Sequence, residues 1–291
     1  MTSPRTEIIQ LIQKSKALPD LPGLITELSE LEAQKDTSTA DMARLISSDE
    51  ELSAKVLRLV NSPFYGFSRT ITSISNALVL LGINIIKSLI LSSSIFELMQ
   101  KTAPGLWRHS LATAVTANII ATRLELENVE EISTAALLHD IGKVVVIVYL
   151  MDDYENILSR KIQRDISSSN VERALLLTDH AEIGLWLTQK WHLPNSLQEP
   201  IAYHHEVESA VEHRTATAVV HYANILTTAR GLGYSGDKQV TAIDEIARQT
   251  LVLPDYMLTD IIATLEYRLD EIKRYSLGDG PDSNSASPSK S

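Results

Sequence analysis

Apolar residues recur every three or four positions along almost the whole of this 291-residue chain, and alternating runs of apolar and polar residues are scarce. This spacing places side chains on one face of an α-helix, whereas a half-buried strand requires a period of two. The pattern therefore predicts an all-α protein. Three of the expected apolar faces contain Leu52, Val56, Leu59 and Val60, then Ile74, Ala77, Leu78 and Leu81, then Val115, Ile119 and Ile120.

One run, VVVIV at 144–148, has strand propensity. Periodicity alone does not assign so short a run, but its helical surroundings favour a buried helix. Several ends of the expected helices carry capping residues or helix breakers. These are the capping-box pairs Ser48 with Glu51 and Asp179 with Glu182, and the stops Pro63, Gly82, Pro194 and Gly231.

The segment KTAPGLW, residues 101–107, divides the helical pattern because Pro104 and Gly105 interrupt it before a new amphipathic run begins. We expect a two-lobed helical bundle, with an N-terminal helical subdomain over residues 1–105 and a second helical subdomain over 106–277. The last residues, 278–291, are small, polar and proline-bearing, a composition that buries too little surface to offset its ordering entropy. We expect this tail to be disordered.

Composition excludes several classes of function. The chain has no cysteine, so neither thiolate ligands nor disulfides are available. Its longest apolar stretch, from Asn76 to Phe96, is interrupted by Gly82, Asn84 and Lys87, so we expect a soluble, cytoplasmic protein without membrane insertion. The net charge of −11 argues against nucleic-acid binding, since such binding depends on neutralising phosphates.

One segment differs from this acidic background. Residues 52–96 contain four basic residues and no acidic residue. A solvated face is the simplest interpretation, and a surface for phosphate or an acidic partner is the alternative. A helix-turn-helix around Gly82, docking on DNA, is a third and weaker interpretation, because one glycine between two apolar helices is common. The four residues are Lys55, Arg58, Arg69 and Lys87.

All eight histidines follow residue 108, and five of them could converge with one aspartate from four segments. Imidazole nitrogens suit first-row transition metals, and a carboxylate can bridge two cations, so the set predicts a site for one or two divalent metals, Fe, Mn or Zn. His192 and His213 are interpreted as background. His221 shares a polar stripe with Thr217, Asn224 and Thr228, so it faces either the site or water, and we expect it to face water. The expected ligands are His109, His139, Asp140, His180, His204 and His205.

The motifs around these residues, LWRHS, LLHDIGK, DHAEIG and AYHHE, resemble the ordered pattern of the HD-domain superfamily of metal-dependent phosphohydrolases. Upstream, LPDLPGLITEL, RLISSDEELSAKVLRLVNSPFYG and ITSISNALVLLGINIIKSLIL are similar to the first half of the HDOD family, bacterial signalling modules related to those hydrolases. The combined resemblance covers about Leu18 to Asn224. It implies an HD-like helical subdomain in the second half of the chain. HDOD proteins often lack the metal ligands and are regarded as regulatory.

By the superfamily's arrangement, the first metal would use His109, His139, Asp140 and a late aspartate, and the second would use Asp140 with His180, His204 and His205. The chain departs from this pattern at the late aspartate, where VVHYANIL places Asn224. An amide oxygen can coordinate a cation, so Asn224 is a weak ligand at most. We expect one metal at the second position. The absence of Gly-Tyr-Pro after HHE does not support a cyclic-dinucleotide phosphodiesterase.

Two functions follow from this resemblance. The favoured one is a regulatory signal-transduction module that holds a metal and acts by binding a signalling partner. The alternative is a metal-dependent phosphohydrolase, in which the metal activates water and Lys143 of HDIGK contacts the phosphate of a substrate or nucleotide ligand.

Overall fold

The computed structural model describes residues 3–14, 23–32, 34, 38–150, 167–236 and 240–274. Within these ranges all regular structure is helical, which confirms the all-α prediction. The helices are α1 (Pro4–Lys14), α2 (Gly23–Glu32), α3 (Thr39–Ser47), α4 (Glu50–Val60), α5 (Ile74–Thr102), α6 (Pro104–Arg123), α7 (Val129–Leu138), α8 (Ile141–Tyr149), α10 (Ser168–Leu176), α11 (His180–Lys190), α12 (Asn195–Tyr203), the 3₁₀ turn η1 (Val207–Ser209), α13 (Arg214–Ala229), α14 (Glu245–Thr250) and α15 (Asp255–Arg274).

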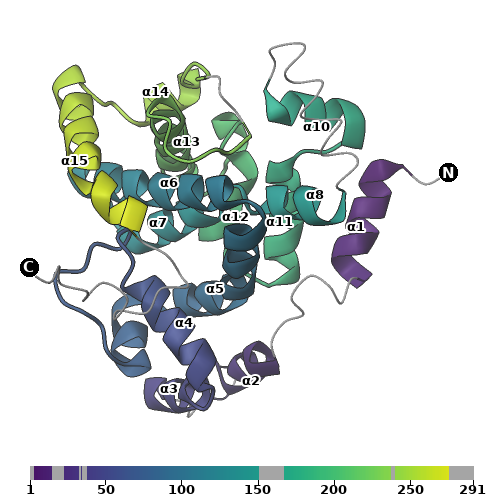
Figure 1. Ribbon diagram of the computed structural model, residues 1–291, viewed down its shortest axis with the longest axis vertical. Coiled ribbons are helices and arrows are strands. Elements are labelled where there is room, and N and C mark those ends of the chain that lie inside the picture. The colour runs from purple at the N-terminus through teal and green to yellow at the C-terminus, as the bar shows by residue number, and fades with distance from the viewer. Residues whose placement is uncertain are drawn as a thin grey trace, which may run out of the picture.

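The helices form two groups, as Figure 1 shows, with α2, α3 and α4 at one end and the helices from α6 onward forming the larger body. Helix α5 contacts both groups, since it packs on α3 and α4 and also on α6, α7 and α8. Gly82 interrupts α5 with φ 76° and ψ 166°. The expected stop is therefore a kink, after which the helix resumes. The division near residue 105 falls at the junction of α5 and α6, and the domain bounds stay a prediction.

Helix α6 is the centre of the larger body. It packs against α5, α7, α13 and α15, and its side chains are buried on almost every face. A helix that is apolar all round has to lie inside the fold, because no face of it suits water. Helix α8 is also enclosed, with Val144, Val145 and Val146 buried. The prediction of a buried helix at VVVIV is confirmed.

The first helix does not join its sequence neighbours. Helix α1 packs on α11, where Arg5 forms an ion pair with Glu182 and its Cζ atom lies 5.1 Å from the centre of the Trp186 ring. Lys190 Nζ donates a hydrogen bond to the carbonyl oxygen of Ile12 over 2.8 Å. These contacts tie the beginning of the chain to the larger body.

The cap of α4 corrects one prediction. The N-cap is Asp49, whose carboxylate accepts from the backbone N–H of Leu52, whereas Ser48 ends α3 and donates its hydroxyl to the carbonyl oxygen of Leu45. A carboxylate at the positive end of a helix is the stronger acceptor, so Asp49 displaces Ser48 from this role. At α11 the predicted N-cap Asp179 is confirmed.

The stretch Ile74–Ser93 of α5 is long and apolar enough to cross a bilayer by length and composition alone, but 56% of the window that qualifies is buried inside the fold. A buried core helix passes the same test, so this feature is weak evidence for a membrane span. The predicted disordered tail, 278–291, lies outside the described residues.

Candidate metal centre

The predicted ligands come together because each lies at or near the end of a helix that points into one place. His109 is on the first turns of α6, and His139 and Asp140 form the junction between α7 and α8. The others follow from α11 and α12. His180 is the first residue of α11, His204 is the C-cap of α12 and His205 follows it. All six side chains are buried except that of His205, which is partly exposed.

Two glycines allow these segments to approach. A Cβ atom on Gly142 would lie 2.0 Å from the carbonyl oxygen of His180, so α8 and α11 meet backbone to backbone beside the site. Gly233 has φ 75°, and a Cβ there would lie 2.2 Å from the backbone nitrogen of His109. No other residue type fits either position without moving a metal-site segment.

Two histidines present an unprotonated nitrogen to the centre. The Nδ1 of His139 donates to the carbonyl oxygen of Ala136 over 2.8 Å, and that of His204 donates to the carbonyl oxygen of Ile201 over 2.9 Å. A carbonyl only accepts, so each ring carries its proton on Nδ1 and leaves a lone pair on Nε2. Neither Nε2 has a hydrogen-bond partner, and neither does the buried Oδ1 of Asp140. A buried acceptor without a donor costs free energy, and a bound cation would satisfy such acceptors.

We call His180, His204 and His205 the three-histidine group. Its ligand atoms lie within 4.8 Å of one another. His180 Nε2 is 3.0 Å from His205 Nε2 and 3.3 Å from Asp140 Oδ1, and His204 Nε2 is 3.9 Å from the same oxygen. Ligands about 2.0–2.1 Å from a tetrahedral metal lie about 3.3 Å apart, so these separations fit one metal ion.

We call His109, His139 and Asn224 the asparagine-side group. His109 Nε2 donates to Asn224 Oδ1 over 3.0 Å, so the nitrogen that would bind a metal carries a proton here. The other oxygen of Asp140, Oδ2, accepts from Lys143 Nζ over 2.8 Å and lies 3.4 Å from His139 Nε2. On this side of Asp140 an ammonium group already supplies positive charge.

Burial keeps most of the rings neutral, which is the form that binds metals. It lowers the pKa of His109 to about 3 and, with nearby histidines, lowers the pKa values of His204 and His205 well below the ordinary value. Burial opposes ionisation of Asp140, but His139 and Lys143 prevail and hold its pKa well below the usual range. The carboxylate of Asp140 is therefore charged, and the rings of His109, His204 and His205 are neutral.

His180 differs because of Glu172, a residue that sequence reasoning missed. Glu172 Oε2 accepts from both the backbone N–H and the Nδ1–H of His180, over 2.8 and 2.6 Å. Burial opposes the charged ring, but Glu172 raises the pKa of His180 above its ordinary value. A carboxylate on Nδ1 orients Nε2 toward a metal and increases its basicity.

His221 is a second correction. It is buried, its Nδ1 donates to the carbonyl oxygen of His204 over 2.7 Å, and its Nε2 accepts from the backbone N–H of Asp244 over 2.9 Å. The ring therefore supports the His204 segment and does not face water. In the sequence, the polar residues that share its face of α13 were the signal that could have indicated this inward position. His192 is exposed, and His213 is half-buried beside Glu212, so both stay outside the centre.

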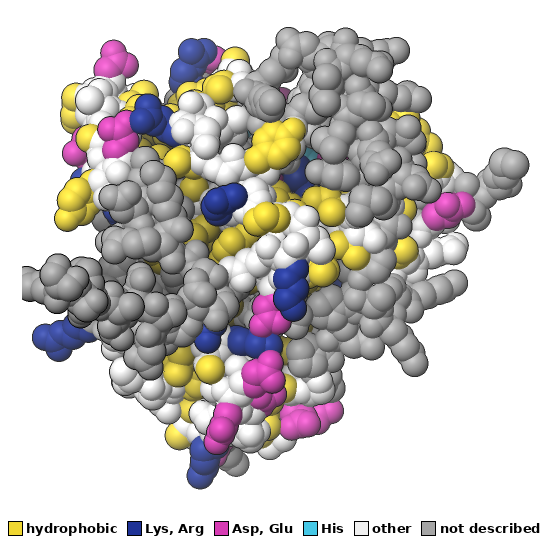
Figure 2. Space-filling model, viewed as in Figure 1, with side chains coloured by type: hydrophobic (Ala, Val, Ile, Leu, Met, Phe, Trp, Pro, Cys, Tyr) yellow, Lys and Arg dark blue, Asp and Glu magenta, His cyan; other side chains and the backbone are white. Residues whose placement is uncertain are grey.

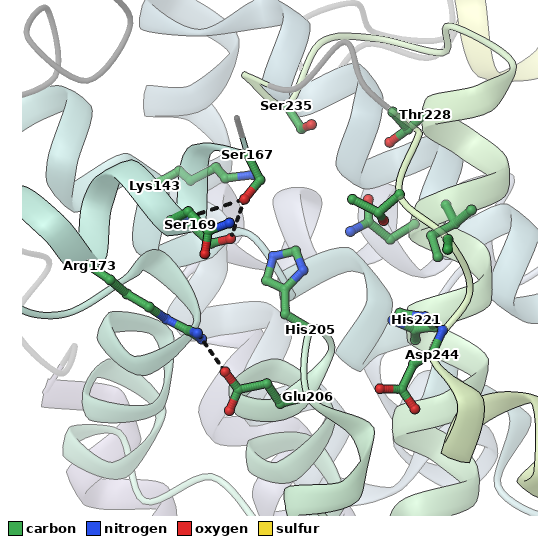
Figure 3. A pocket seen from close by; sticks show the side chains of 15 residues that line it. Lys143, Ser167, Ser169, Arg173, His205, Glu206, His221, Thr228, Ser235 and Asp244 are labelled. Atoms are coloured by element: carbon green, nitrogen blue, oxygen red, sulfur yellow. Dashed lines mark hydrogen bonds and ion pairs between the residues drawn. The ribbon is translucent and has the colours of Figure 1, made fainter. Parts of the chain in front are cut away.

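A cavity of about 280 Å³ opens beside the three-histidine group (Figure 3). Lys143 and His205 reach it from the metal centre, and hydroxyl side chains surround them. Arg173 of α10 closes one side by pairing with Asp179 over 2.6 Å and with Glu206 over 2.6 Å. The same helix therefore supports His180 from inside through Glu172 and braces the neighbouring segments from outside through Arg173.

The fold is all-helical and encloses a centre of buried histidine and aspartate side chains. Comparison with known proteins identifies the family. The family model of the HDOD domain matches residues 18–207, so this chain belongs to the HDOD domain family. The recognition made from the sequence motifs is confirmed.

Solved structures share the fold over most of the chain. An HDOD domain protein of unknown function from Geobacter sulfurreducens has a TM-score of 0.68 at 27% identity, covering 92% of this chain and 96% of that one. A protein described as a candidate signal transduction protein from Marinobacter aquaeolei VT8 has a TM-score of 0.68 at 20% identity, over 93% and 64% of the two chains.

A protein described as a candidate metal-dependent phosphohydrolase from Shewanella amazonensis SB2B has a TM-score of 0.59 at 19% identity, over 94% and 99%. Among curated proteins, an uncharacterized protein of Treponema pallidum (strain Nichols) is 26% identical over 213 residues. That match covers 72% of this chain and 42% of the relative, so this chain spans under half the length of that protein.

Proposed function

We propose that this chain is a regulatory signal-transduction module that holds one divalent transition metal and acts by binding a signalling partner. The metal would be held by the three-histidine group and Oδ1 of Asp140. Three imidazoles and one carboxylate suit Zn, and also Fe or Mn, and give a net charge of +1. A bound metal supplies charge and rigidity at the point where four segments meet.

The observation that carries this proposal is the unequal state of the two oxygens of Asp140. Oδ1 lies 3.3 and 3.9 Å from the Nε2 atoms of His180 and His204 and has no hydrogen-bond partner, whereas Oδ2 is already bonded to Lys143. A second cation beside Oδ2 would meet the Lys143 ammonium, the protonated Nε2 of His109 and the neutral amide of Asn224. Two-metal hydrolysis requires both cations, so a single metal would not support that mechanism.

The test is the metal content of the full chain purified without chelator, measured by mass spectrometry beside its hydrolysis of a generic phosphodiester and of cyclic nucleotides. We expect about one equivalent of metal and hydrolysis no faster than that of a matched blank. Two equivalents with rapid turnover would replace the regulatory function with the hydrolase function. A chain that binds no added Zn, Mn or Fe would refute the metal site.

The second candidate function, a metal-dependent phosphohydrolase, is favoured by the cavity in Figure 3. Lys143 and Arg173 line it together with several hydroxyl groups and the carboxylates of Glu206 and Asp244, and it adjoins His205. Such a lining suits the phosphate of a nucleotide. Lys143 Nζ is held 2.8 Å from Asp140, so it could contact a phosphate only at the mouth of the metal centre. Hydrolysis that disappears in Lys143→Gln while one metal is retained would support this function.

A further inference from the structure

The basic segment 52–96 contributes one arginine to a second site. Lys55 pairs with Glu51 and Glu97 over 2.7 and 3.0 Å, and Lys87 pairs with Glu32. Figure 2 shows basic and acidic side chains next to one another over the lower part of the molecule, where α2, α3 and α4 lie. Arg69 is different, because it is exposed and forms no ion pair with any described residue.

Arg69 lies on the loop of residues 61–73, which connects α4 to α5 and is held at both ends. Asn61 Nδ2 donates to the carbonyl oxygens of Leu57 and Ile71 over 2.7 and 2.8 Å, and Asn61 Oδ1 accepts from the backbone N–H of Ile71 over 2.7 Å. Arg268 of α15 donates to the carbonyl oxygen of Pro63. The loop is therefore fixed against the last helix.

Between this loop and α15 is a hollow of about 650 Å³, which we call the loop–α15 hollow. Two guanidinium groups, Arg69 and Arg268, line it, and among the residues that the structure describes no aspartate or glutamate does. Ser62 also lines it, with its side chain 2% exposed and its hydroxyl without a hydrogen-bond partner. Other lining hydroxyls belong to Ser68, Thr70, Thr264 and Tyr267.

We propose that the loop–α15 hollow binds the phosphate groups of a soluble small molecule. Guanidinium forks match phosphate oxygens with charge-assisted hydrogen bonds, and an unsatisfied buried hydroxyl supplies a further donor. Two arginines without a lining carboxylate are unexpected in a chain of net charge −11, unless the hollow takes an anion. Its volume lies within the range of small-molecule sites, about 300–1,000 Å³.

This site is separate from the metal centre, and its residues come from both helix groups. Ser62 and Arg69 belong to the loop before α5, whereas Thr264 and Arg268 belong to α15, which packs on α6. A bound phosphate would therefore connect the two groups at a position where Arg268 now provides a direct hydrogen bond.

The experiment is isothermal titration of the full chain with pyrophosphate and with ATP at low salt. Arg69→Gln is the main variant because the side chain is exposed, so the fold is expected to be retained. Losing a charge-assisted hydrogen bond should weaken pyrophosphate binding about tenfold or more. Lys101→Gln, which removes an exposed charge elsewhere, should bind as the wild type does.

Two further variants assign the site. Lys143→Gln tests the metal centre as the place of binding, and Arg268→Lys keeps the charge while removing the fork. We expect Lys143→Gln to bind normally and Arg268→Lys to bind more weakly. No binding by either anion, or binding lost in Lys143→Gln and retained in Arg69→Gln, overturns the proposal. If ATP binds more tightly than pyrophosphate and Tyr267→Ala removes the difference, the ligand is a nucleotide; equal binding identifies phosphate groups alone.

Discussion

The three-histidine group and the asparagine-side group lie on opposite sides of one carboxylate and are built from similar side chains, yet they differ in what they leave unsatisfied. His204 Nε2 and Asp140 Oδ1 have no partner on the first side. On the second side, a proton on His109 and the ammonium of Lys143 satisfy Asn224 Oδ1 and Asp140 Oδ2, and His139 Nε2 is left without a partner. The comparison shows that matching the motif does not make the two sites equal. The amide of Asn224 and the ammonium of Lys143 occupy one side of Asp140, so only its other oxygen, Oδ1, lacks a partner.

The largest expected effect comes from His204→Ala. This change removes a direct ligand from the three-histidine group, so metal affinity should fall more than about 100-fold, beyond the loss that outer partners cause. Mass spectrometry of the purified protein measures it. His213→Ala is the matched control, since His213 lies outside the centre beside Glu212. Unchanged metal content in His204→Ala would place the metal elsewhere.

Glu172→Gln should have the next largest effect. Glutamine keeps an acceptor for His180 but removes the charge that raises the basicity of the ring, so metal affinity should fall about 10–100-fold. Competition with a chelating dye measures the affinity. Glu208→Gln, which changes an exposed side chain, should bind metal as the wild type does. Equal affinity in Glu172→Gln and the wild type would show that His180 does not depend on this carboxylate.

Asn224→Asp should reduce the difference between the two groups. A carboxylate there would add a negative charge and could bind a cation directly in place of the neutral amide, so bound metal should rise from about one toward about two equivalents and slow phosphodiester hydrolysis should appear. The measurements are metal stoichiometry and turnover. Asn195→Asp adds the same charge at an exposed position on α12 and should change neither. A variant that stays at one metal would show that Lys143, rather than Asn224, limits the second site.

Removing the metal should produce the smallest effect, a change in thermal stability. A ligand at 100 times its dissociation constant stabilises the native state by about 2.7 kcal/mol. For a chain of this size that corresponds to about 5–10 °C in melting temperature. Calorimetry before and after treatment with a chelator measures the shift, and re-addition of metal should restore it. In His204→Ala the chelator should have no effect.

Much of the fold and of the centre could be predicted from the sequence. Helical spacing predicted the faces of α4, α5 and α6, and the order of motifs brought His109, His139, Asp140, His180, His204 and His205 to one place. What sequence failed to predict depends on tertiary contacts. No spacing links Glu172 to His180, and the packing of α13 against the His204 segment turned His221 inward. Asp49 displaced Ser48 as a cap because local hydrogen bonding, not the motif, decides such ends.

The contact at Gly142 limits how this family can vary. The backbones of α8 and α11 touch because Gly142 has no side chain. This backbone contact, rather than the packing of side chains, sets the distance between Asp140 and His180. A methyl group at Gly142 would separate the two helices, whereas a change of side chain at Asn224 leaves this backbone contact in place. The frame of the centre and the identity of its polar side chains are therefore carried by different atoms.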